Sequence, residues 1–439
     1  MNAELRILHT KAEEELAAMF RAERTRAPAG QGAWRDDAFA RFERAGLPHR
    51  RVESWKYTDL RALLRSVPPL AREPSHERLK DFLLRDRLPG LDRARIVVVN
   101  GVFRADLSDL SEVDGITIRS LAEVIASEPD RIGRLFAGNA DAVVSLNAAL
   151  ASGGVVVSVS KDARPALPIE IAHFATLDQP ASVFSRDLVE VGENASVRFV
   201  DTYYGPAAMA YQVNAATELD VGQGANVTWA RLQGEGSDAV HLGSLGASVG
   251  ADGTLTHLIV SAGASLSRWQ GFVTIAGRGA HVGFYGANML AGREHGDLAL
   301  VVNHAEGYSQ SRELFKNVVD GDAEGAFQGR IVVEPGAQKT DAKMMAQALL
   351  LSDHAQFASK PELEIFADDV QCGHGATAGR IDEALLFYLM ARGIPRSEAE
   401  RLLIEAFLAD AIDAVGDEAI ASALKGPVAA WLARRGGAQ

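Results

Sequence analysis

"EVGENASVRFVD", residues 190–201, joins two runs of apolar and β-branched residues through a turn at Gly192. The pattern returns three times further on: DVGQGANVTWAR (220–231), SVGADGTLTHLI (248–259) and IAGRGAHVGFYG (275–286). The turn glycines of the four copies are spaced by 30, 28 and 27 residues: Gly192, Gly222, Gly250 and Gly277. Self-similarity at this period is typical of a repeat architecture, and strands joined without intervening helices favour a β-solenoid over helical or leucine-rich repeats.

A β-sandwich is the alternative, since it also consists of short strands. A sandwich does not repeat one turn signature at near-constant spacing, however. Small residues beside the turns, Ala195, Ala225 and Ala280, would allow successive coils to stack closely. We therefore expect a mainly β fold with a right-handed parallel β-helix core over residues 154–375.

The flanking regions have a different pattern. Residues 1–95 are predicted to be helical, 96–153 to form a small mixed α/β segment, and 376–439 to form a carboxy-terminal helical domain. In the last region, Ser397 and Glu400 fit a capping box at the start of a helix. The apolar stripe of these helices would either cap the open end of the solenoid or contact a partner.

Composition limits the classes of protein. The chain has 439 residues, 47% of them hydrophobic, and a net charge of −13. An acidic protein of this kind is a poor candidate for binding nucleic acid. The sequence contains no run of eighteen apolar residues, the length that a membrane-spanning helix requires. The first residues do not resemble a signal peptide. We expect a cytoplasmic protein.

Most catalytic motifs are absent from the sequence. Lys339 and Thr340 imitate the end of a phosphate-binding loop, but Gln338 stands where that motif requires glycine. There is no Gly-x-Ser-x-Gly, His-Glu-x-x-His or Cys-x-x-Cys pattern. His295 and His304 are nine residues apart on one expected strand, so they should face opposite sides.

The one cysteine of the chain lies in "ADDVQCGHGATAGRID", residues 367–382. Cys372 and His374 are two residues apart on an expected strand, so both side chains can face the same way. An adjacent imidazolium would lower the pKa of the thiol and make it more reactive. Two ligands do not complete a tetrahedral metal site, and an ordinary buried cysteine is the other interpretation.

The residues around Cys372 also resemble a known family. "PELEIFADDVQCGHGATAGRIDEALLFYLMARGI" (361–394) resembles the carboxy-terminal signature of the SufB/SufD family, which consists of scaffold components of the SUF iron–sulfur cluster assembly machinery. The preceding block, from "SRELFKNVVDGDAEG" at residue 311, extends the resemblance to residues 311–407. "GLPHRRVESWKYTDL" (46–60) is similar to the amino-terminal helical region of the SufD branch, and a single cysteine also suits that branch.

The resemblance implies a non-catalytic scaffold subunit. Its partners would be a SufB-like paralogue, bound through the β-helix end, and a SufC-like ABC ATPase, bound through helices at 381–414. His374, and secondarily Cys372, would bind a transient iron–sulfur cluster shared with the paralogue. Gly373 departs from the family, which often has serine there.

Two other functions remain as alternatives. A β-helical polysaccharide lyase or esterase would need a groove of charged residues recurring at coil spacing, which the sequence does not show. A homodimeric structural scaffold without cluster chemistry would use the exposed end of the β-helix to pair with a second copy.

Overall fold

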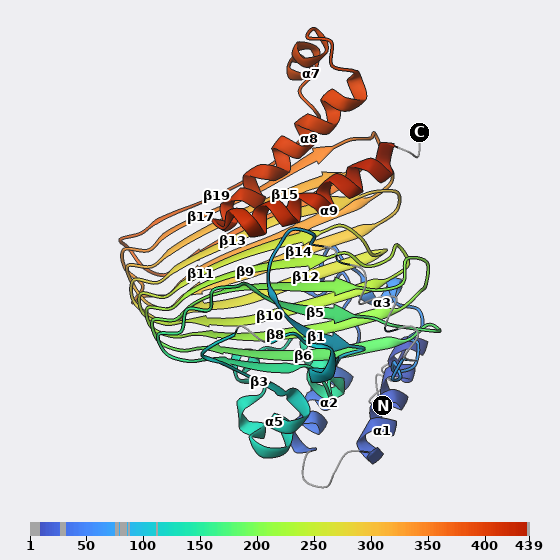
Figure 1. Cartoon of the computed structure of the whole chain (residues 1–439), viewed down its shortest axis with the longest axis vertical. Coiled ribbons are helices and arrows are strands. Elements are labelled where there is room, and N and C mark those ends of the chain that lie inside the picture. Colours follow the sequence, from blue (N-terminus) through green and yellow to red (C-terminus); the bar gives the residue numbers. More distant parts are fainter. Residues whose placement is uncertain are drawn as a thin grey trace, which may run out of the picture.

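A computed structural model of the chain confirms the predicted fold class. It is a parallel β-solenoid with helices before and after it (Figure 1). The structure describes these residues: 9–26, 32–74, 79, 86, 88–110 and 113–436.

Two large sheets form the walls of the solenoid. One has ten strands in the order β19-β17-β15-β13-β11-β9-β7-β5-β1-β2, and the other nine in the order β18-β16-β14-β12-β10-β8-β6-β4-β3. Each turn adds one strand to each sheet, so the sixteen strands from β4 to β19 make eight turns. Their bounds are β4 Val155–Val159, β5 Ile169–Phe174, β6 Ser182–Val191, β7 Ser196–Tyr204, β8 Gln212–Val221, β9 Asn226–Gln233, β10 Val240–Val249, β11 Thr254–Ser261, β12 Leu266–Ile275, β13 His281–Leu290, β14 His295–His304, β15 Gln310–Val319, β16 Glu324–Val333, β17 Asp341–Leu350, β18 Gln356–Ile365 and β19 Gln371–Gly379.

The predicted turn glycines stack on one another. Gly222 donates its backbone N–H to the Val191 carbonyl one turn earlier, and Gly250 does the same to Val221. A Cβ at Gly277 would lie 1.9 Å from the backbone nitrogen of Ala251 in the preceding turn. These positions exclude a side chain because the coils approach so closely, which explains why glycine recurs there.

The inside of the solenoid is a continuous apolar core. Residues of both sheets alternate inward and outward, and the inward ones form one buried cluster that runs from Ile96 to Ala367. The small residues Ala195, Ala225 and Ala280 are fully buried at the turns, as their spacing predicted.

The segment before the solenoid contributes to both sheets. Strand β1 (Ala94–Val99) pairs in parallel with β5 and carries the short antiparallel β2 (Val102–Phe103). Strand β3 (Ile116–Ser120) pairs antiparallel with β4. The boundaries predicted for the four regions stay a prediction, but these strands join the mixed segment directly to the core.

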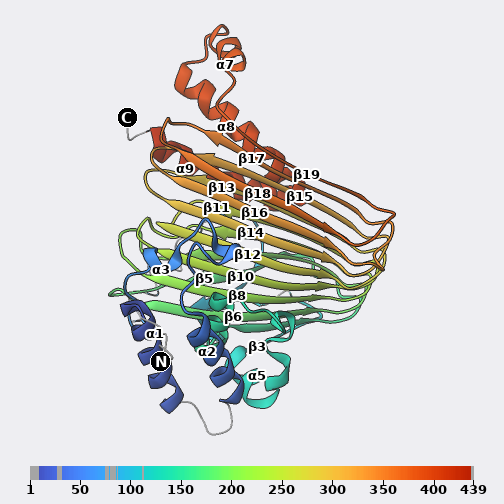
Figure 2. The ribbon, with the colours of Figure 1, turned by 180° about the vertical axis from the view of Figure 1, so that it is seen from behind.

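The helices of the amino-terminal part pack on the outer surface of the solenoid. Helix α6 (Ala142–Leu150) is wholly buried between one sheet and the amino-terminal helices. The other helices of that part are α1 Lys11–Arg26, α2 Ala33–Ala45, α3 Leu60–Leu63 and α5 Leu121–Ser127. Helices α1, α2 and α5 gather at the end of the molecule opposite to α7, whereas α3 lies part-way along the side of the solenoid (Figure 2).

The carboxy-terminal helices are α7 (Glu383–Met390), α8 (Arg396–Ile412) and α9 (Glu418–Gly436). Helix α8 packs on β11, β13 and β15, and α7 projects beyond the last turn (Figure 1). The predicted capping box is wrong: α8 begins one residue before Ser397, has Pro395 as its N-cap, and lacks a side-chain cap. Glu400 accepts a hydrogen bond from Arg396 instead. No described helix has the length and apolar character that a membrane span requires.

Candidate functional site

The last turn of the solenoid leaves both sheets with an open edge. Strand β18 pairs only with β16, and β19 pairs only with β17. Strand β19 contains Cys372 and His374, so both predicted site residues lie on an edge strand, which is paired on one side only. An edge strand presents a row of unpaired backbone N–H and C=O groups that another strand can use.

The residues in register with Cys372 and His374 on β17 show which side of the sheet these two side chains face. Cys372 is in register with Ala342, and His374 with Met344; Ala342 and Met344 are both buried. Cys372 is half-buried and packs against the solenoid core, whereas His374 is exposed. The two side chains therefore stand at inward positions of the terminal turn, about 7 Å apart along the strand.

The thiol does not have the electrostatic environment expected from its sequence. Burial raises the pKa of Cys372, and the carboxylates of Asp341 and Glu313 raise it further. The expectation that an adjacent imidazolium would lower this pKa is wrong for the chain on its own. The Cys372 thiol is thus protonated at neutral pH until a metal ion or a partner changes its surroundings.

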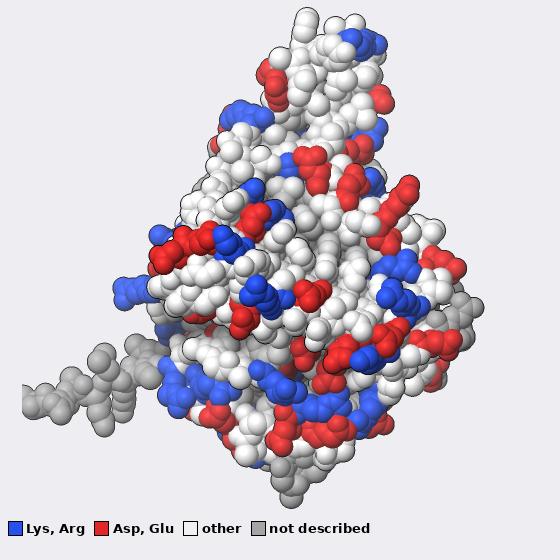
Figure 3. Space-filling view, turned by 90° about the vertical axis from the view of Figure 1, so that its left-hand side faces the viewer, with Lys and Arg blue, Asp and Glu red and all other residues white. Residues whose placement is uncertain are grey.

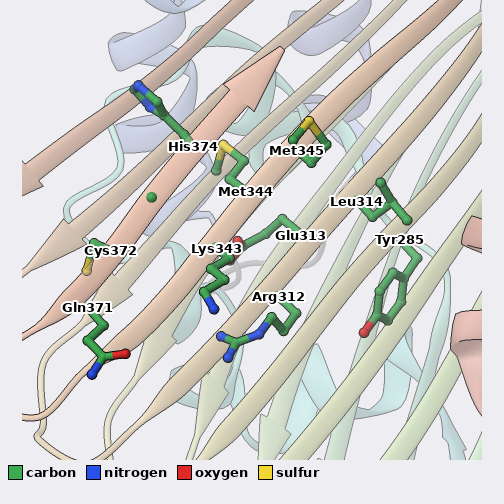
Figure 4. A pocket seen from close by; sticks show the side chains of 11 residues that line it. Tyr285, Arg312, Glu313, Leu314, Lys343, Met344, Met345, Gln371, Cys372 and His374 are labelled. Atoms are coloured by element: carbon green, nitrogen blue, oxygen red, sulfur yellow. The ribbon is translucent and has the colours of Figure 1, made fainter. Parts of the chain in front are cut away.

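A cavity of about 490 Å³ lies at this end of the molecule. Figure 4 shows side chains around it from β13, β15, β17 and β19. Its lining residues are Tyr285, Arg312, Glu313, Leu314, Lys343, Met344, Met345, Gln371, Cys372, Gly373 and His374. A Cβ at Gly373 would have nothing within 4 Å, so the serine common in the family would fit there.

Glu313 is the functional candidate that the sequence analysis missed. Its side chain is 3% exposed, and neither carboxyl oxygen makes a hydrogen bond of good geometry in the described part of the chain, the Ser311 hydroxyl being its nearby polar partner. Burial raises the pKa of Glu313 to about 8, and nearby Ser311 and Arg312 only partly offset this effect. Its burial could have been predicted from the alternation of side chains along the strand. Glu313 stands two residues before the inward-facing Phe315 on β15, so it faces the same side.

The other histidines considered have structural partners. His304 is fully buried, with Nδ1 2.8 Å from the Ser309 hydroxyl and Nε2 3.0 Å from the Ser311 hydroxyl. His295 lies 2.9 Å from the hydroxyl of Thr58. Within the described residues, no group of three or more His, Cys, Asp or Glu side chains is placed to hold a metal ion.

Helix α7 exposes an unusually apolar surface. Leu386 is its one buried residue, whereas Phe387 is 73% exposed and Tyr388 53% exposed. Figure 3 shows the top of the molecule, where α7 lies, as mostly uncharged, while positive and negative side chains are mixed over the body below. The view shows no single-sign patch that would suit a polyanion.

Two family models match this chain. Residues 174–407 match the SufBD core domain of SUF system iron–sulfur cluster assembly, and residues 11–171 match the SufBD amino-terminal region. The chain belongs to the SufBD family. The resemblance seen in residues 311–407 and 46–60 is therefore confirmed, and the protein is a SufD-like iron–sulfur cluster assembly protein.

Similar SufBD proteins occur in distant bacteria. The iron–sulfur cluster assembly protein SufD of Escherichia coli is 30% identical over 382 residues, which cover 86% of this chain and 87% of that protein. A SufBD family protein of Synechocystis is 30% identical over 386 residues, 84% of each chain. SufD of Bacillus subtilis is 28% identical over 282 residues, 63% of this chain and 64% of that protein.

Proposed function

We propose that this SufBD protein is a non-catalytic, cytoplasmic scaffold subunit for iron–sulfur cluster assembly. It pairs with a SufB-like paralogue through the open end of its solenoid and with a SufC-like ABC ATPase through α7 and α8. The nascent cluster is its substrate, shared between the two paired chains.

The edge strand β19 carries this proposal. Its sequence, QCGHGATAG, contains no charged residue and no proline, the features that usually protect a sheet edge from pairing. The strand before it in space, β17, is paired on both sides, so β19 is the outermost strand of its sheet at the last turn. A partner strand added there would lie directly beside Cys372 and His374.

The ligand chemistry of this end suits iron. Imidazole nitrogen and thiolate sulfur both bind iron in proteins, and two ligands from one chain leave positions for two from the partner. His374 is the first candidate because it is exposed at the edge; Cys372 is second because its thiol is half-buried and protonated.

The exposed apolar side chains of α7 support the second contact. Leu385, Phe387, Tyr388 and Met390 are each more than two-fifths exposed on one short helix. Lys316 holds the base of the adjoining α8 through Asp410, with 2.9 Å between Nζ and the carboxylate, and lies against the ring of Phe407. The helix pair is thus anchored at its base and free at its tip.

The test is native mass spectrometry of the tagged protein, purified anaerobically from cells that also express a paralogue and an ATPase of the SUF type. We expect recovery in one complex with both. Recovery only as a homodimer, when both partners are supplied, would favour the structural scaffold, and activity on polysaccharides would favour a lyase or esterase. Either result would refute the proposed function.

A further inference from the structure

One corner of the solenoid holds a residue of left-handed backbone conformation in each turn. It is the corner at which each even-numbered strand from β4 to β16 leads into the next odd-numbered strand, at the left of Figure 1. The backbone N–H of each such residue donates to a carbonyl group in the following turn. The φ angles lie between 55° and 74° in the seven residues of this corner ladder, which are Asp162, Asn194, Gly224, Asp252, Gly279, Tyr308 and Lys339.

Most residues of the corner ladder suit this conformation. Glycine has no Cβ, and asparagine and aspartate tolerate a positive φ better than other residues do. Tyr308 and Lys339 do not follow this rule, although their φ angles are 59° and 65°. A bulky side chain at such an angle strains the backbone, and proteins retain this strain mainly where the side chain has a function. The two exceptions are the ladder residues nearest to the open end, which indicates that the function belongs to that end.

Tyr308 and Arg278 form an exposed pair at this corner. Tyr308 is 50% exposed, and the guanidinium carbon of Arg278 lies 3.8 Å from the centre of its ring. Arg278 is exposed as well, and no carboxylate among the described residues pairs with it. A guanidinium stacked on a ring keeps the N–H groups along its edge free, and these groups fit a carboxylate through two parallel hydrogen bonds. The pair is thus a preformed site for an acidic side chain.

The pair is continuous with the open end of the solenoid. Lys339, the next residue of the corner ladder, forms an ion pair with Asp369 in the turn between β18 and β19. Phe366 in the same turn is 61% exposed, and Ile365 before it is 41% exposed. An exposed strip therefore runs from Phe366 at the last turn to Tyr308 two turns earlier.

The composition of this strip is typical of a protein interface. Tyrosine, phenylalanine and arginine are enriched at interfaces, and tyrosine and arginine are among the residues that contribute most of the binding energy. Two turns of the solenoid correspond to about 10 Å, a distance that three extended residues span. A chain paired along the edge of β18 and β19 therefore reaches the Tyr308 ring, and the guanidinium stacked on it, with one short loop.

We propose that Tyr308 and Arg278 form a second contact with the SufB-like paralogue, outside the paired edge strands, in which a loop of the paralogue places a carboxylate on Arg278 and an apolar side chain on Tyr308. The inference rests on the proposed function, because it assigns a further part of the surface that meets the same partner. It also explains why a strained tyrosine is retained at a position where asparagine would suit the backbone better.

The experiment measures the affinity of the full-length protein for the immobilised paralogue, by biolayer interferometry at several salt concentrations. Tyr308→Asn should weaken binding about tenfold, since asparagine has no ring to bury in the contact. Because asparagine suits a positive φ, the same variant should have a urea midpoint no lower than that of the wild type. Arg278→Gln should also weaken binding about tenfold and reduce its salt dependence, because the charge pair is lost.

Two variants serve as matched controls. Tyr308→Phe keeps both the ring and the strained backbone, so it should bind the paralogue as the wild type does. Asp252→Asn changes a residue of the corner ladder two turns further from the open end, and it should leave the affinity unchanged. If Tyr308→Asn is less stable than the wild type, Arg278→Gln, which leaves the backbone of the ladder unchanged, decides the question by its affinity.

The outcomes separate this inference from the proposed function. If the wild type binds the paralogue and both Tyr308→Asn and Arg278→Gln bind equally well, the strip is not a contact, and only this inference is refuted. If the wild type does not bind the paralogue at all, the proposed function and this inference both fail. If Asp252→Asn loses as much affinity as Tyr308→Asn, the effect belongs to the corner ladder as a whole, which also overturns the inference.

Discussion

Glu313 makes the stability of the protein depend on pH. Its pKa is about 8 in the folded chain against 4.5 for an ordinary glutamate, so the folded state holds the proton more tightly than the unfolded state. Below pH 4.5 both states are protonated and there is no penalty. The free energy of unfolding should fall as pH rises from 4.5 to 8, by on the order of 5 kcal/mol.

The Glu313→Gln variant should lack this part of the pH dependence and be more stable than wild type at pH 8. Urea denaturation at several pH values measures it. Burial also raises the pKa of Tyr285 and of Cys372, and the charge of Glu313 raises both further, so the variant should lose that part of their shifts as well. Glu324→Gln, at a half-exposed side chain, is the control that should change little. Equal pH profiles for wild type and Glu313→Gln would show that the carboxyl is not buried as described.

His374 and Cys372 should differ in importance. His374 is exposed at the edge, whereas Cys372 is half-buried with a raised pKa. We therefore expect Cys372→Ser to keep more activity than His374→Ala when the complex is assayed for cluster assembly. Near-wild-type activity for both variants would contradict the shared site.

At the scale of elements, the stacked turns impose a strict limit on side-chain size. Alanine at Gly277 would drive its Cβ into the backbone of Ala251, whereas alanine at Gly336 would have nothing within 4 Å. We expect Gly277→Ala to lose on the order of 1–3 kcal/mol and Gly336→Ala to stay within about 0.5 kcal/mol of wild type. Urea midpoints measure both, and equal effects would contradict close stacking at Gly277.

Two exposed phenylalanines offer a pair of matched substitutions. Phe387 on α7 is 73% exposed, and Phe366, just after β18 at the open end, is 61% exposed. Phe387→Asp should abolish co-purification of the ATPase but not of the paralogue, because an aspartate cannot enter an apolar contact without cost. Phe366→Asp should do the reverse. Affinity capture of the three-chain complex distinguishes them, and loss of the same partner in both variants would refute the assignment of the two surfaces.

Local pattern predicted some elements well and others poorly. The turns at Gly192, Gly222, Gly250 and Gly277 were found because each is a short-range signature repeated along the chain. The start of α8 was placed wrongly because Ser397 satisfies a capping pattern in sequence, while the helix already begins at Arg396. The residues that β1 and β5 pair are 75 positions apart in the sequence (Ala94 with Ile169), and no local pattern predicts this pairing.

The candidate site was predictable only in part for a similar reason. Cys372 and His374 are two residues apart, and side chains at this spacing face the same side of a strand. Glu313 is about sixty residues earlier and joins them only through the register of β15, β17 and β19. A glutamate in an alternating strand is ordinarily taken as solvent-exposed, so its burial emerges only from the fold.

At the scale of the whole molecule, the two ends of the solenoid differ. The first turn ends in β2 and β3, which are two and five residues long and antiparallel to their neighbours. Short edges of this kind discourage further pairing, and α5 packs against β3 and β4 there. The last turn has β18 and β19, ten and nine residues long, with no described element on their outer edges.

This asymmetry limits growth. A solenoid with two open ends could add units head to tail and form filaments, but a chain with a single open end terminates any assembly after one contact. Two copies, or one copy and a paralogue, would meet face to face and leave no free edge. We expect light scattering at increasing concentration to plateau at two solenoids per particle; filaments would show that the first turn is open as well. The short strands β2 and β3 thus prevent pairing at the first turn. The open edge of β18 and β19 at the last turn can then serve assembly without leading to fibres.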